Sequence, residues 1–144
     1  MRMGYVTIAV GLAFWPMAKE AQASLLITIT QSSSGVTENG TGSLDVTGLY
    51  NAGTYTNDTA FIDPVDSQTA VGDVGSRTIY YVFYNAFVPY GTGGYINASS
   101  GAGSLVGFTP GTLVGSIFVP PGYTSGSQIN SSAFYAVKLS LILG

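Results

Sequence analysis

The sequence predicts an all-β protein, an antiparallel β-sandwich or jelly-roll-like single domain that follows an N-terminal signal helix. Residues favoured in strands are plentiful, and Gly, Pro and Asn separate them. The helix formers Glu, Lys, Gln and Arg are scarce. Several segments alternate apolar and polar residues with period two, and short strands between turn signals are typical of two-sheet folds.

The first 23 residues have the layout of a secretory signal peptide. Arg2 gives a positive start, residues 5–15 form an uncharged apolar run, and Ala21 and Ala23 offer small side chains at the spacing of a cleavage site. The alternatives are a buried N-terminal helix and an uncleaved membrane anchor. A spanning anchor needs about 20 apolar residues, roughly twice this run. We expect cleavage after Ala23.

The remaining residues, 24–144, are one domain on length grounds. Its first strand is expected at residues 27–30, where apolar and polar side chains alternate as in a half-exposed strand. A second strand is expected at residues 42–49. Asn39-Gly40 stands just before it and favours a tight hairpin turn.

The middle of the chain is predicted to be less regular. Residues 50–75 carry several acids and Asp63-Pro64, which indicates a long connection with one short strand at residues 59–62. The apolar and aromatic run at residues 79–84 predicts a central strand covered on both faces.

Four strands are expected after this run, separated by Gly-rich or Pro-Gly turns: residues 95–98, 104–108, 113–119 and 132–143. Pro120-Pro121-Gly122 ends the third of these. In the last one, period two places an apolar set on one face, and Lys138 and Ser140 on the other. The apolar set is Tyr135, Val137, Leu139, Leu141 and Leu143.

Charge excludes some partners of the mature chain. Its only basic residues are Arg77 and Lys138, against six acids, for a net charge of −4. The six acids are Glu38, Asp45, Asp58, Asp63, Asp66 and Asp73. Nucleic acid is not an expected partner because its phosphates must be met by many cations. An anionic lipid surface is disfavoured for the same reason.

The residue inventory also restricts chemistry. The chain has no His and no Cys, which excludes a Ser-His-Asp triad, a cysteine nucleophile and an ordinary zinc site. We therefore expect no enzyme and no cofactor. Asp63, Asp66 and Asp73 are the acids that can ligate calcium or serve as paired carboxylates on a glycosidic bond. Their spacing matches no calcium loop, so solvated loop acids are the expected alternative.

Tyrosines offer the clearest candidate contacts with a ligand. Tyr80, Tyr84, Tyr90 and Tyr95 can stack on sugar rings if their side chains are exposed. The alternative is a core strand whose tyrosine hydroxyls reach the sheet edge, because alternation turns half of any strand inward.

Several turn-rich segments carry a resemblance to exported bacterial proteins of the PEP-CTERM sorting class. They are residues 40–49 (GTGSLDVTGL), 90–95 (YGTGGY), 98–103 (ASSGAG) and 119–126 (VPPGYTSG), in that order. The resemblance covers roughly residues 24–136. It implies export to the cell surface or extracellular matrix, with no established catalytic activity and no catalytic residues.

The C-terminus departs from that class. Its members end in a Pro-Glu-Pro sequence, a hydrophobic helix and a basic cluster, whereas this chain ends in VKLSLILG. Either the chain is truncated or frameshifted after about Ala136, or it is a relative without the tail. No stable membrane anchor is then expected after signal cleavage.

Two functions from different classes follow from the sequence. The first is a structural protein of the cell surface or extracellular matrix, associated with biofilm or exopolysaccharide. The second is a carbohydrate-binding module that uses surface tyrosines, assisted by calcium. The expected partners are extracellular polysaccharide or other surface proteins.

Overall fold

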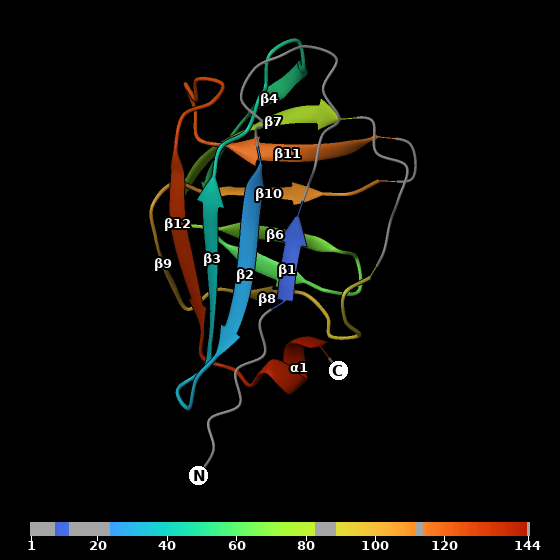
Figure 1. The fold of residues 1–144 in the computed structure, drawn as a ribbon, viewed down its shortest axis with the longest axis vertical. Helices are drawn as coiled ribbons and strands as arrows, with labels where there is room; N and C mark the ends of the chain where they lie inside the picture. The colour runs from blue at the N-terminus through green and yellow to red at the C-terminus, as the bar shows by residue number, and fades with distance from the viewer. Residues whose placement is uncertain (1–7, 12–23, 83–88, 112–113, 144) are drawn as a thin grey trace.

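The computed structural model describes residues 8–11, 24–82, 89–111 and 114–143, which form two antiparallel β-sheets and one short helix (Figure 1). The five-stranded sheet has the order β1 (Ile8–Gly11), β2 (Leu25–Gln31), β3 (Val36–Gly42), β12 (Ile129–Tyr135) and β9 (Ser100–Ala102). The seven-stranded sheet has the order β4 (Tyr50–Asp58), β7 (Gly75–Val82), β11 (Gly115–Val119), β10 (Val106–Thr109), β6 (Gln68–Val71), β5 (Phe61–Asp63) and β8 (Ile96–Asn97). The helix is α1 (Leu139–Leu143).

The two sheets pack face to face, and Figure 1 shows the strands β2, β3 and β12 running across those of the seven-stranded sheet. The core lies between them. On β2 the expected alternation is present, with Leu25, Ile27 and Ile29 each at most 2% exposed. From the other sheet, Val71, Val106 and Ile117 are equally buried. The predicted all-β, sandwich-like architecture is confirmed.

Four of the predicted strands lie where the sequence places them. Residues 27–30 lie within β2, and the three later segments at 95–98, 104–108 and 113–119 correspond to β8, β10 and β11. The turn at residues 120–122 also forms, with the Tyr123 N–H donating to the Pro120 carbonyl at 3.1 Å.

The predicted hairpin turn at Asn39-Gly40 is wrong, because both residues lie inside β3. The turn between β2 and β3 is at residues 32–35, where the Ser32 N–H donates to the Gly35 carbonyl at 2.8 Å. Gly40 has another role. A Cβ atom there would lie 2.6 Å from Val71 Cγ1 of the opposite sheet, so glycine permits close packing of the two sheets.

The predicted strand at residues 42–49 is also wrong, since β3 ends at Gly42 and residues 43–49 have no ladder partner. Leu44 and Val46 are buried as alternation predicts, but side chains from the far end of the chain satisfy their N–H groups. The Leu44 N–H donates to the Tyr123 hydroxyl and the Val46 N–H to Ser125 Oγ, both at 2.9 Å.

Residues 50–75 are not a long connection. They contain β4, β5 and β6, and only the short strand expected at residues 59–62 corresponds to one of these, β5. β4 is an exposed edge strand, and most of its residues are polar. An alternation of apolar and polar residues therefore cannot be read from its sequence. The prediction for residues 79–84 is partly right. β7 lies between β4 and β11, but Tyr81 is 47% exposed, and residues 83 and 84 lie outside the described residues.

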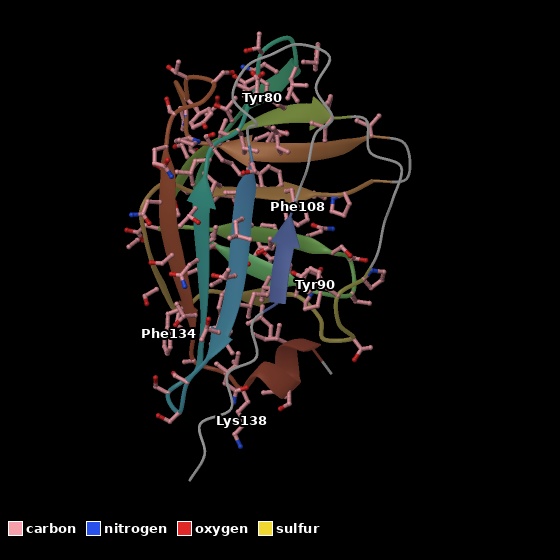
Figure 2. All side chains as sticks on the ribbon, in the orientation of Figure 1. Tyr80, Tyr90, Phe108, Phe134 and Lys138 are labelled. Atoms are coloured by element: carbon pink, nitrogen blue, oxygen red, sulfur yellow. The ribbon has the colours of Figure 1, made fainter. Side chains whose placement is uncertain are left out.

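The predicted last strand, residues 132–143, is only half strand. β12 ends at Tyr135, and α1 follows. The helix turns Ile142 into the core at 0% exposure, while Leu141 is 62% exposed, so the single apolar face predicted from period two does not exist. Lys138 is exposed as expected and points away from the body of the protein (Figure 2).

The N-terminal segment differs from the expected signal helix. Residues 8–11 of the predicted apolar run form β1, an edge strand that pairs with β2 from Ile8↔Ile29 to Gly11↔Leu26. An unpaired strand edge presents backbone N–H and C=O groups that can pair with an extended segment. Ile8 and Val10 are β-branched residues, which favour the extended conformation. The cleavage-site residues Ala21 and Ala23 lie outside the described residues.

Candidate functional site

The four tyrosines proposed from the sequence lie in different surroundings. Tyr80 is half-buried against the core on β7 (Figure 2). Tyr90 is also half-buried, and its hydroxyl donates to the Gln68 carbonyl at 2.9 Å. Tyr95 is 55% exposed. Tyr84 lies outside the described residues. The structure therefore does not bring this set together as one contact surface.

A different set of tyrosines shares one surface, the outer face of the seven-stranded sheet. Its members are Tyr50, Tyr55, Tyr81 and Tyr95, which are 69%, 53%, 47% and 55% exposed. We call this surface the tyrosine face. Among the residues that the structure describes, every other tyrosine is half-buried or buried. Within the described ranges, the exposed tyrosine area is thus concentrated on one side of the sandwich.

Strand pairing positions the first members of the face. Tyr50 on β4 is directly opposite Tyr81 on β7, and their rings stack with centroids 5.7 Å apart and planes 11° apart. Tyr55 is opposite Arg77, four residues before Tyr81 on β7. Residues an even number apart on a strand point to the same face, so all four side chains lie on one side.

A β-bulge makes this possible. Tyr50 and Tyr55 are five residues apart, and in a regular strand they would point to opposite faces. The register shifts between Asn51 and Gly53, which leaves Ala52 without a partner on β7. The Asn51 side chain accepts a hydrogen bond from the Gly53 N–H at 2.8 Å, and Gly53 has φ 119°. The bulge returns Tyr55 to the face of Tyr50.

Between these exposed tyrosines lie three largely buried side chains, those of Arg77, Phe61 and Phe118. The Arg77 guanidinium lies over the rings of Phe118, at 4.1 Å, and Phe61, at 5.9 Å. Arg77 Nε is 2.6 Å from Asp58 Oδ2. Tyr95 stacks on Phe61 with centroids 4.9 Å apart. Tyr95, just before β8, therefore packs on a buried residue of β5, and the Arg77–Asp58 ion pair adds no net charge to the face.

The chemistry of the tyrosine face suits a ligand with both apolar and hydroxyl groups. Tyrosine rings supply large rigid apolar contacts, and their hydroxyls hydrogen-bond at the rim. Burial, with Asp58 nearby, raises the pKa of Tyr95, so its hydroxyl remains protonated and can donate at neutral pH. Neither a nucleophile with an adjacent base nor a pair of facing carboxylates lies among these residues.

The three aspartates proposed as calcium ligands are placed separately. Asp63 is buried at the end of β5, with Oδ1 lacking a hydrogen-bond partner. Asp66 is exposed in the turn before β6, and Asp73 is exposed after β6, where its Oδ1 accepts from the Val74 N–H at 2.8 Å. Across the described ranges, no group of three or more acidic, His or Cys residues could hold a metal ion.

One carboxyl group lies between the sheets. Glu38 on β3 is 0% exposed; it accepts hydrogen bonds from the Thr69 hydroxyl of the opposite sheet at 2.5 Å and from the Tyr135 hydroxyl at 2.9 Å. Burial raises the pKa of Glu38 to about 7, against the lowering effect of these two hydrogen bonds. Burial and the nearby Glu38 raise the pKa of Tyr135 and of Tyr90 far above the usual value. Since all three bonded residues are buried, this cluster holds the sheets together and is closed to a ligand from solvent.

A neutral groove of about 530 Å³ lies beside the turn at residues 120–124. Its walls include Ser104, Pro121, Tyr123 and Asn130, and none of its lining residues is charged. The Tyr123 hydroxyl is already engaged, because it donates to the Ser127 carbonyl at 2.6 Å. The groove is compatible with a neutral polar ligand, but it exposes less aromatic surface than the tyrosine face.

Comparison with known proteins adds no relative, because no family model, curated protein or solved structure matches this chain. Among the described residues, no helix is long and apolar enough to cross a membrane. Evidence on function therefore comes from the sequence and the geometry.

Sequence reasoning identified Tyr95 but missed Tyr50, Tyr55 and Tyr81 as a group. The signal that could have found them is Asn51 with Gly53, since an Asn side chain followed by glycine suits a bulge, and a bulge puts residues five apart on the same face. The prediction of a long connection at residues 50–75 leaves no place for a bulged strand there.

Proposed function

We propose that this protein is an exported protein of the cell surface or extracellular matrix that acts by adhesion and not by catalysis, with the tyrosine face binding extracellular polysaccharide. The proposal rests on one observation, the gathering of the exposed tyrosines on one side of the sandwich. The signal-peptide pattern of residues 1–23 supports export. The resemblance to PEP-CTERM proteins supports the same destination.

The physical basis is complementarity between aromatic rings and sugar rings. A stacked pair of exposed tyrosines presents apolar area that water solvates poorly, and rigid rings lose little conformational entropy on binding. The hydroxyls of the exposed tyrosines can donate hydrogen bonds to sugar hydroxyls and accept hydrogen bonds from them. Because the face has no net positive charge, a neutral polysaccharide fits better than an anionic one.

The test measures retention of the purified exported chain by a panel of neutral and anionic polysaccharides in affinity electrophoresis. The Tyr50→Ala/Tyr81→Ala variant is expected to bind at least about tenfold more weakly, for a loss of roughly 1.4 kcal/mol or more. The Tyr50→Phe/Tyr81→Phe variant keeps the rings and should retain most of the binding. Leu141→Ala, at an exposed apolar residue of α1, is the matched control and should bind as the wild type does.

Two results would count against the proposal. One is the absence of retention by any polysaccharide. The other is binding that survives Tyr50→Ala/Tyr81→Ala but is lost in Asn130→Ala, which would place the ligand in the neutral groove instead.

A further inference from the structure

In the described part of the chain, the side of β2 that pairs with β1 is the one long, regular strand edge that would become free if β1 were removed. Besides β1, the edge strands of the two sheets are β4, β8 and β9. β4 is interrupted by two register shifts, and β8 and β9 are only two and three residues long. Bulges and short length are the usual devices that prevent unwanted strand pairing.

β2 has none of these devices. Its seven residues, LLITITQ, contain no charge, proline or glycine, and they pair with β3 in unbroken register from Leu25↔Gly42 to Gln31↔Val36. In the folded chain β1 covers this edge. However, β1 lies within the segment expected to be removed with the signal peptide. Cleavage after Ala23 would therefore leave β2 as a bare acceptor strand.

We propose that, after the leader is removed, a second copy of this chain occupies the edge left by β1, through antiparallel β2–β2 pairing about a two-fold axis. This interface goes beyond the proposed polysaccharide binding and uses the other sheet. The pairing of β1 with β2 shows that this edge accepts an antiparallel strand.

The sequence of β2 is suited to pairing with itself. With Thr28 on the two-fold axis, Ile27 lies opposite Ile29 of the partner subunit, and Thr28 lies opposite Thr28 of the partner subunit. Cross-strand β-branched pairs and Thr–Thr pairs are favourable, and the absence of charge removes like-charge repulsion. A two-fold contact uses the same edge of both subunits, so it closes as a dimer and leaves the short β9 at each end of the joined sheet.

The test uses protein exported with its own leader, with intact mass confirming a start at Ser24, and light scattering after size exclusion over a dilution series. The wild type is expected to have twice the mass of the mature chain. Thr28→Lys should be a monomer, because two ammonium groups would meet on the axis. Thr28 is half-exposed on the outer side of β2, so the substitution leaves the core intact.

Thr41→Lys is the matched control. Thr41 lies on the adjacent strand β3, exposed on the same outer side, but one strand away from the edge. This variant should stay dimeric. A stronger test mixes Thr28→Lys with Thr28→Glu, each monomeric alone, and expects a heterodimer of opposite charges. A monomeric wild type, retention of the leader, or equal dissociation by Thr41→Lys would overturn the proposal.

Discussion

At the scale of single residues, the buried side chain of Glu38 is expected to make the free energy of unfolding depend on pH. Its carboxyl group lies between the two sheets. It accepts hydrogen bonds from the Thr69 hydroxyl of the opposite sheet and from the Tyr135 hydroxyl of its own sheet. No Lys or Arg among the described residues forms an ion pair with it. The neutral, protonated form is therefore favoured in the fold, because ionisation would place an unpaired charge in an apolar core.

This arrangement predicts a stability that falls as pH rises. The pKa of Glu38 is about 7 in the folded chain and near 4.5 when unfolded, so the folded state binds more protons between these values. The free energy of unfolding should decrease from about pH 4.5 to above pH 7, by about 3 kcal/mol in total, at 1.36 kcal/mol per pKa unit. Denaturant unfolding at a series of pH values measures it.

The control for Glu38 is Glu38→Gln, which keeps an acceptor oxygen but cannot ionise. Its unfolding free energy should be nearly flat over the same pH range. An equal pH dependence in both proteins would assign the effect to other groups.

At the scale of elements, α1 is the clearest case in which tertiary contacts override a local pattern. The residues LSLIL suit a strand or a helix. The helix is selected by docking, since Ile142 is fully buried and its carbonyl accepts from the Gly93 N–H at 3.1 Å. At Gly93 a Cβ atom would lie 2.0 Å from that carbonyl, so glycine is required for this approach.

If α1 seals the core, Ile142→Ala should lower the free energy of unfolding by about 2–5 kcal/mol, the usual cost of removing a buried isoleucine side chain. The adjacent Leu141→Ala, at a side chain that is 62% exposed, should change it by no more than about 0.5 kcal/mol. Urea denaturation of the two variants checks the contrast. Equal effects would show that the helix is not docked as described.

At the scale of the whole molecule, the sandwich depends on pairing between distant parts of the chain. β3 pairs with β12 from Gly42↔Ile129 to Val36↔Tyr135, and β4 pairs with β7 across two intervening strands. Ring contacts across the outer sheet face, such as Arg77 over Phe61 and Phe118, are equally non-local. Closing these long loops costs conformational entropy, and the stabilising contacts form only after closure.

Such a topology predicts slow folding. Refolding of the mature chain should take roughly milliseconds to seconds, as for other two-sheet proteins with non-local pairing. Stopped-flow tyrosine fluorescence suits this measurement because the only tryptophan, Trp15, lies in the expected leader. Folding in microseconds would imply that local contacts dominate, contrary to the strand order described.

The sequence by itself determined the fold class, the absence of His and Cys, and the position of strands such as β2, β10 and β11. In those strands alternation and flanking turns act locally, so they are readable along the chain. Only the tertiary structure decided that Asn39 and Gly40 lie inside a strand, that residues 43–49 bond to the loop after β11, and that α1 is helical. These outcomes depend on partners far along the chain. The same holds for the tyrosine face, where a bulge and a cross-strand register bring together Tyr50, Tyr55 and Tyr81, which period two alone would separate.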